Sequence, residues 1–347
     1  MLTLLGIDPH KVSHQAVAVD ANGAPLGRLQ VKARPAGHAE LLGWARREFP
    51  GPRLWAVEDE RNMAGQLLRD LLAAGERVVT VPAHIAADYR KQGRRRGKSD
   101  AIDATAVARA ALREQLPDLV LDEASRDLKM LTDHRTSLVE ERVRLQNRLR
   151  DLLHQLDPDL AAEIPSGGLT RYCWLDDIIA AYTAQSGVSA AIVVDLAQAC
   201  RDLTEKIKKL ERQLTPLVTA AVPDLLAMPG CGVLTAARIV GEVAGVRRFR
   251  SEAALATYAG IAPLDASSGQ QQHHRLNRHG NRLLNAAIYQ LAITQLRIHP
   301  PARAYLERRI GAGNTWKVAM RALKRQLIRA VYNTLTRQTT PPAAAAA

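Results

Sequence analysis

The chain has 347 residues and is 47% hydrophobic, which is enough for two or three domains with cores of their own. Its 48 lysines and arginines exceed 35 aspartates and glutamates, and the net charge of +13 favours a polyanionic partner, nucleic acid first, over a basic protein without one. The absence of an apolar run of roughly 20 residues excludes a membrane span. The three cysteines, Cys173, Cys200 and Cys231, lie far apart without a CxxC pair, which argues against a disulfide scaffold and against a zinc site.

The first 120 residues predict an α/β domain that opens with three antiparallel strands. Apolar patterns predict these strands at 2–7, 16–19 and 26–31, and Asn22-Gly23 predicts a hairpin between the last two. Helices and strands then alternate, with a helix at 37–48, a strand at 53–58, a helix at 62–74, a strand at 77–81 and a helix at 83–91. This order is typical of a ribonuclease-H-like domain.

A basic loop and a further helix complete this domain. The loop is a predicted contact with nucleic acid through four basic residues, Arg94, Arg95, Arg96 and Lys98. Ser99 is a suitable N-cap for a helix from Asp100 to about Arg113.

Residues 121–222 predict a coiled-coil helical hairpin. Leucines recur every seven residues at 131, 138, 145 and 152, and the companion series at 128, 135, 142, 149 and 156 includes two arginines. A second seam is apolar throughout, at 193, 200, 207 and 214 and at 196, 203, 210 and 217. The heptads do not decide whether these helices pack on each other or on a second subunit, and 158–190 is a connection without a predicted shape.

Residues 223–338 predict a mainly helical domain, and the alanine-rich stretch 339–347 a disordered tail. Gly230 and Gly232 mark a turn between helices that either binds phosphate through its backbone, as helix-hairpin-helix elements do, or has no ligand. Further basic residues are predicted to contact phosphates or to form a solvated face, Arg275, Arg278, Arg282, Lys317, Arg321 and Lys324. The predicted fold class is therefore α/β followed by all-α.

Four carboxylates predict a metal centre. Asp8 ends the first strand and Glu58 the fourth, so a parallel pairing of these strands brings both to one edge of the sheet. Asp100 and Asp103 share one face of a helix at its first turn. Such a cluster suits Mg²⁺ or Mn²⁺, and two ions of this kind promote phosphodiester cleavage or transfer.

Each acid taken singly also has a structural explanation. Asp100 and Asp103 can merely charge the first turn of their helix, and Glu58 stands in an acidic EDE string. Asp59 or Glu60 replaces Glu58 if the strand is longer. The conjunction of strand-end acids with a helix pair behind a basic loop is what predicts the metal centre.

Several strings occur together, in order: GIDPHKVSHQAVAVD, WAVEDE, KSDAIDA, MPGCGVLTAARIVGEV and TYAGIAPLDASSG. Together they resemble the transposases of the insertion sequence 110 family over nearly the whole chain. The resemblance implies a RuvC-like domain that holds Mg²⁺ on Asp8, Glu58, Asp100 and Asp103. It also implies a nucleophilic serine, Ser268, although the adjacent Ser267 is an alternative.

The same resemblance implies a recombinase guided by a structured noncoding RNA, the bridge RNA, that pairs with donor and target DNA. Members of this family act as dimers that assemble into tetramers. We expect strand exchange through a phosphoserine intermediate in a cytoplasmic, nucleoid-associated prokaryotic protein. The alternatives are a hydrolytic junction resolvase or nuclease that uses the same acids with water, and a nucleic-acid-binding protein without catalysis.

Overall fold

The computed structural model describes residues 2–58, 64–91, 99–119, 122–265, 274–276 and 280–339. Two compact units make up the chain, one formed by residues up to 121 together with Arg247–Arg250 and one formed by Asp122–Val246 and the residues from Ser251 onward. The helical residues on both sides of position 222 belong to the second unit. Among the described helices, none combines the length and apolar character that crossing a bilayer requires.

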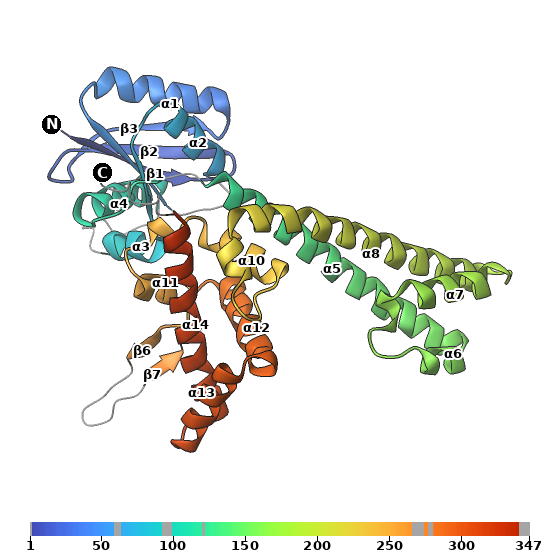
Figure 1. Cartoon of the computed structure of the whole chain (residues 1–347). Coiled ribbons are helices and arrows are strands. Elements are labelled where there is room, and N and C mark those ends of the chain that lie inside the picture. The colour runs from blue at the N-terminus through green and yellow to red at the C-terminus, as the bar shows by residue number, and fades with distance from the viewer. Residues whose placement is uncertain are drawn as a thin grey trace, which may run out of the picture. The chain divides into compact units, whose positions relative to one another are not determined.

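The first unit is built on a five-stranded mixed sheet (Figure 1). Its strands lie in the order β3-β2-β1-β4-β5. Only β2 is antiparallel to its neighbours, while β1 pairs in parallel with β4 and β4 with β5. The bounds are β1 Thr3–Pro9, β2 Ser13–Val19, β3 Pro25–Lys32, β4 Arg53–Glu58 and β5 Val78–Val81. This confirms the predicted three-strand opening followed by a parallel extension, with ends shifted by up to three residues.

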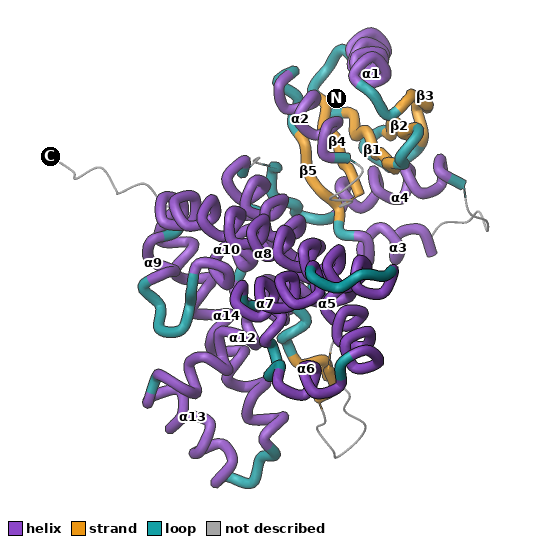
Figure 2. Tube along the Cα trace, turned by 90° about the vertical axis from the view of Figure 1, so that its right-hand side faces the viewer, coloured by secondary structure: helices purple, strands orange, loops and turns teal. Residues whose placement is uncertain are grey.

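Helices cover both faces of this sheet (Figure 2). Side chains that alternate along the strands form two cores, because successive residues of a strand point to opposite faces. Leu5, Ile7 and Trp55 belong to the core under α1 (Pro35–Glu48) and α2 (Gly65–Ala73). Their neighbours Leu4 and Ala56 belong to the opposite core, under α3 (Ala83–Lys91) and α4 (Asp100–Arg113).

Gly6 sets the distance between α4 and the sheet. A Cβ atom at Gly6 would lie 2.0 Å from the carbonyl oxygen of Ala104 and 2.5 Å from the amide nitrogen of Ala108. Both obstacles are backbone atoms of α4, which no side-chain rotation can remove. The helix therefore contacts β1 backbone to backbone, one turn beyond Asp100 and Asp103.

Two histidines lie in the core on the other face of the sheet. The rings of His14 and His38 stack with centroids 5.2 Å apart, and His38 Nδ1 lies 2.5 Å from Asp70 Oδ2. His14 Nδ1 has no hydrogen-bond partner among the described residues. Burial lowers the pKa of His14 to about 4, and the neighbouring His38 and His10 add to this effect. His14 is therefore a neutral core residue at physiological pH.

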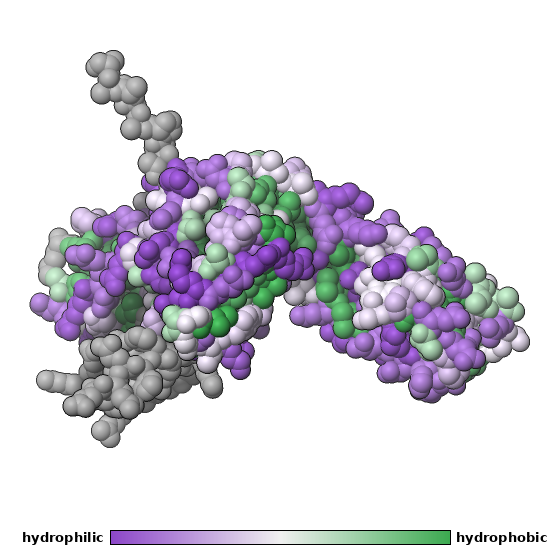
Figure 3. Space-filling model, turned by 60° about the horizontal axis from the view of Figure 1, so that its bottom comes forward, coloured by the Kyte–Doolittle hydropathy of each residue, from purple (hydrophilic) through white to green (hydrophobic). Residues whose placement is uncertain are grey.

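The second unit contains a long helical hairpin, in which α5 (Glu123–Leu156) and α8 (Val188–Ala221) run antiparallel. Arg135 pairs with Glu211 at 2.7 Å, and Arg142 donates to Thr204 Oγ1 at 3.2 Å, so residues contact in reverse order along the two helices. The connection between them forms α6 (Pro158–Glu163), a 3-10 turn η1 (Gly168–Thr170) and α7 (Tyr172–Thr183). In Figure 3, hydrophilic and hydrophobic residues are interspersed on the surface of this hairpin.

The face of α5 that turns inward differs from the predicted leucine seam. Leu128, Thr132, Leu149 and Leu153 are buried, whereas the leucines at 131, 138, 145 and 152 are only half-buried. On α8 the predicted seam is buried as far as Leu214 except for Leu210, which is half-buried, but Leu217 is exposed and Val218 is buried in its place. Leu128 and Leu149 belong to the predicted companion series, so the buried face of α5 follows that series in part, and a coiled coil is not established.

The remaining helices pack near one end of this hairpin. The bounds are α9 Pro223–Leu226, α10 Val233–Val243, η2 Val246–Arg248, α11 Glu252–Tyr258, β6 Pro263–Asp265, β7 His274–Leu276, α12 Arg282–Ile298, α13 Pro300–Gly311 and α14 Trp316–Thr339. A buried carboxylate, Glu242 on α10, accepts from Lys129 Nζ of α5 at 2.7 Å and from Asn281 Nδ2 at 2.7 Å. This network ties α10 to α5 and to the start of α12.

Replacing Gly6 by alanine is expected to destabilise the first unit by about 3 kcal/mol or more, because the new methyl group meets the backbone of α4. Urea unfolding followed by circular dichroism measures this change. The control is Gly43→Ala within α1, where the added Cβ meets only the end of the Arg47 side chain, and which should stabilise by a few tenths of a kcal/mol or more. Equal stability of the two variants would contradict the close contact.

The buried His14 makes stability depend on pH. Its pKa is about 4 in the folded protein and 6.5 in the unfolded chain, so only the unfolded chain takes up the proton between these values. Protonation of His14 in the unfolded chain alone lowers the free energy of unfolding by about 3 kcal/mol in total. This loss is absent above pH 6.5 and grows as the pH falls towards 4. Unfolding free energies measured from pH 7 to pH 4.5 should fall less steeply for His14→Leu, and identical slopes would show that His14 is not responsible.

Candidate metal centre

Asp8 and Glu58 end two neighbouring parallel strands. The pairing of β1 with β4 reaches Ile7 opposite Val57, so the next residues, Asp8 and Glu58, stand at the same level. Asp8 comes two positions after Gly6, which contacts α4, and Glu58 two positions after Ala56 of the core under α4, which directs both to the face that α4 covers. Asp8 is almost fully buried and Glu58 is partly buried.

The first turn of α4 brings two further carboxylates to this edge. Ser99 caps the helix, and its Oγ accepts from the amide of Ile102 at 3.4 Å. Asp103 is buried and accepts from Arg90 Nη1 of α3 at 2.9 Å, whereas about half of the Asp100 side chain is exposed. The helix is held on β1 by the Gly6 contact, so the position of these acids depends on that contact.

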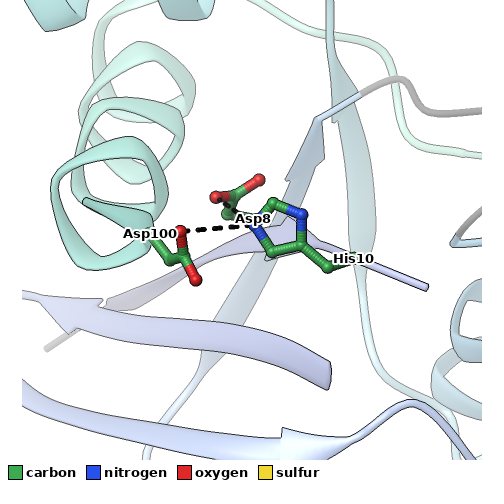
Figure 4. A group of neighbouring side chains, drawn as sticks. All are labelled: Asp8, His10 and Asp100. Carbon is green, nitrogen blue, oxygen red and sulfur yellow. Dashed lines mark ion pairs between the residues drawn. The ribbon is translucent and has the colours of Figure 1, made fainter. Parts of the chain in front are cut away.

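His10 completes the cluster (Figure 4). Its Nε2 atom lies 3.2 Å from Asp8 Oδ2 and 3.4 Å from Asp100 Oδ1. One ligand atom each from Asp8, His10 and Asp100 lie within 4.8 Å of one another. Within the described part of the chain, this is the one group of three or more such side chains, and Glu58 is not a member of it.

The charges around Asp8 oppose its ionisation. Burial raises the pKa of Asp8 above its ordinary value, His10 works in the opposite direction, and the carboxylates of Asp103 and Asp100 raise the pKa further. A divalent cation would reverse this balance, because it stabilises the ionised form of every neighbouring carboxylate. The donor set of carboxylate oxygens with one imidazole nitrogen fits such an ion.

Of the four predicted acids, the structure brings Asp8 and Asp100 together and places Asp103 close enough to raise the pKa of Asp8, whereas His10 and Arg90 are not predicted. His10 follows Asp8 by two positions, and residues two apart in an extended chain point to the same side. The sequence therefore already indicates that His10 lies on the same side of the chain as Asp8. Arg90 gives no such signal, because its contact with Asp103 depends on how α3 packs beside α4.

The predicted nucleic-acid contacts of the second unit have varied surroundings. Gly230 has a φ of 79° in a turn closed by the Cys231 amide donating to Met228, and the exposed Gly232 precedes α10. Three of the basic side chains are exposed, Arg282, Lys317 and Arg321.

The prediction that Lys324 contacts nucleic acid is wrong. It is buried, and its Nζ donates to Asn285 Oδ1 at 2.6 Å. Burial also lowers the pKa of its ammonium group, with a smaller effect of Arg321. A phosphate contact requires an accessible ammonium, so we leave Lys324 out of the nucleic-acid interface. The spacing of basic residues on α14 does not reveal that Lys324 is buried, because an amphipathic helix can also turn a lysine inward when a polar partner is present.

Several predicted residues lie outside the described part of the chain. These are Ser267, Ser268, Arg278, the basic residues Arg94, Arg95, Arg96 and Lys98, and the alternative acids Asp59 and Glu60. Arg275 lies in β7, but its side chain is not among those described.

The two flanks of the serine-bearing segment are nonetheless held together. The Asn281 amide donates to the Tyr258 carbonyl at 2.7 Å, and Asn285 Nδ2 donates to the Ala259 carbonyl at 2.8 Å. A Cβ atom on Gly280 would lie 2.2 Å from the Gly260 amide nitrogen. The residues on either side of this segment therefore lie together, next to the buried Glu242.

Comparisons with known proteins cover almost the whole chain. A family model described as a transposase matches residues 5–158, and one described as a transposase of the IS116/IS110/IS902 family matches residues 223–307. The protein of insertion element IS116 from Streptomyces clavuligerus is 31% identical over 93% of this chain and 92% of its own length. That of insertion element IS900 from Mycobacterium paratuberculosis is 26% identical over 94% of each. Thermus thermophilus RuvC with a Holliday junction substrate, 19% identical, gives a TM-score of 0.26 over 32% of this chain and 94% of its own.

Asp8→Asn should separate stability from metal binding. Without divalent ions the variant is expected to melt at or above the wild-type temperature, because it removes a buried carboxylate whose ionisation is opposed. Millimolar Mg²⁺ should raise the melting temperature of the wild type but not of the variant. The control is Asp88→Asn, a well-exposed acid, which should respond to Mg²⁺ as the wild type does. A Mg²⁺ response retained in Asp8→Asn would contradict the site.

Proposed function

Since this chain belongs to the IS116/IS110/IS902 family of transposases, we propose that it exchanges DNA strands by metal-assisted chemistry through a phosphoserine intermediate. The observation that carries this proposal is the grouping of Asp8, His10 and Asp100 at one edge of the sheet, with Asp103 close enough to raise the pKa of Asp8. Three acids from two distant segments meet there at an electrostatic cost. Such a cost is typical of a functional site rather than of a structural one.

The chain's own residues would hold the cation. Asp8, Asp100 and Asp103 supply the carboxylates, and Glu58 stands level with Asp8 on the next strand as the fourth acid of the proposed set. Mg²⁺ or Mn²⁺ at such a site supplies charge stabilisation for phosphoryl transfer. Arg90 orients Asp103 through its 2.9 Å ion pair.

The proposed nucleophile is Ser268. Its hydroxyl oxygen forms a bond to a DNA phosphorus while the bond from that phosphorus to the departing strand breaks, and the departing oxygen takes up a proton. A hydroxyl of the incoming strand end then attacks the same phosphorus and restores the serine hydroxyl. The number of phosphodiester bonds is conserved, so this exchange needs no nucleoside triphosphate.

We further propose that a structured noncoding RNA pairs with donor and target DNA and so selects the sites. In such a system the protein needs to contact mainly the backbone and shape of the duplexes. The charge of +13 and the exposed Arg282, Lys317 and Arg321 support this role. The proposed active assembly is a dimer that associates into a tetramer, with the metal centre and the serine supplied by different subunits.

A denaturing gel tests the chemistry. Purified protein is mixed with Mg²⁺, the RNA encoded beside its gene and labelled DNA from an element end. The wild type is expected to give a slow, protease-sensitive labelled band that represents a covalent protein–DNA adduct. Ser268→Ala and Asp8→Ala should both abolish this band, whereas Asp88→Ala should retain it.

The matched variant Ser267→Ala identifies the nucleophile, because the two serines are adjacent. Loss of the adduct in Ser267→Ala alone would move the role to that residue. Cleavage without any adduct, unaffected by either serine variant, would favour a hydrolytic nuclease that uses the same acids with water. DNA binding without any cleavage, unchanged by Asp8→Ala, would favour a non-catalytic binding protein.

A further inference from the structure

His10 is held in a fixed position beside the acids. It stands at the turn between β1 and β2, where its amide donates to the Ser13 carbonyl at 3.0 Å. Asp8 lies in β1, two residues earlier, and Asp100 lies at the start of α4. The imidazole of His10 therefore reaches both carboxylates from a closed turn of the backbone.

The distances within this group fit neighbouring ligands of one ion. Adjacent donors of an octahedral ion with bonds near 2.1 Å lie about 3.0 Å apart. The Nε2 atom of His10 lies 3.2 Å from the nearer oxygen of Asp8 and 3.4 Å from that of Asp100. About half of the surface of the His10 and Asp100 side chains is exposed, which leaves one side of the group open to water or a phosphate oxygen.

We propose that His10 is a nitrogen ligand of the metal centre and that it gives the centre a preference for Mn²⁺ over Mg²⁺. Imidazole is a poor ligand for Mg²⁺, which favours oxygen donors, and a better one for Mn²⁺ and the later transition metals. Carboxylates alone favour Mn²⁺ much less. This inference rests on the proposed function only in requiring that Asp8 and Asp100 bind a divalent cation.

Titration calorimetry on the full-length protein measures the preference directly. The wild type is expected to bind Mn²⁺ at least about tenfold more tightly than Mg²⁺. His10→Ala should weaken Mn²⁺ binding by about tenfold and Mg²⁺ binding by less than about threefold. Lys11→Ala is the control, because it removes an exposed cation from the same turn without removing a ligand.

Pulsed electron paramagnetic resonance of the Mn²⁺-loaded protein gives a second readout, independent of activity. Coupling of the Mn²⁺ electron spin to a ¹⁴N nucleus is expected in the wild type and in Lys11→Ala, and it should disappear in His10→Ala and His10→Asn. Absence of this coupling in the wild type, or its persistence in both His10 variants, would overturn the assignment. In that case the proposed function stands if Mn²⁺ still binds and Asp8→Asn abolishes the binding. A wild type that binds neither ion would contradict both proposals.

Discussion

The contact between Gly6 and α4 is the constraint on which the candidate site depends. A strand and a helix approach each other here until their backbone atoms touch, which only glycine permits. Because α4 begins one turn earlier, this contact places Asp100 and Asp103 beside the buried Asp8. In the first unit, the close contact of Gly6 with α4 thus lies beside the cluster of Asp8, His10 and Asp100.

One buried charge of the second unit, Glu242, is stabilised by pairing. Glu242 is almost fully buried, yet it accepts from both Lys129 and Asn281, so its desolvation is compensated by charge-assisted hydrogen bonds. The same principle applies to the inner face of the helical hairpin, where Arg135 pairs with Glu211. In the first unit, by contrast, the like charges around Asp8 leave part of that cost uncompensated, as expected where a cation binds.

The sequence predicts the parts of this protein that depend on local patterns and fails where distant packing decides. The order of strands and helices along the chain, the α4 cap at Ser99 and the approach of Asp8 and Asp100 all follow from alternation, capping and spacing. The buried face of α5 follows less directly, because its buried Leu128 and Leu149 belong to the series that contains arginines, whereas the leucines at 131 and 138 are half-buried. Lys324 is hidden for a related reason: its partner Asn285 lies on another helix.

The closed flanks of the segment between β6 and α12 have a consequence for how such proteins can diversify. Tyr258, Gly260, Gly280 and Asn281 join the two flanks, so the helices that follow are positioned independently of the chain between them. A change in chain length between positions 265 and 280 would leave these contacts in place, so the start of α12 is expected to keep its position whatever the number of residues inserted there.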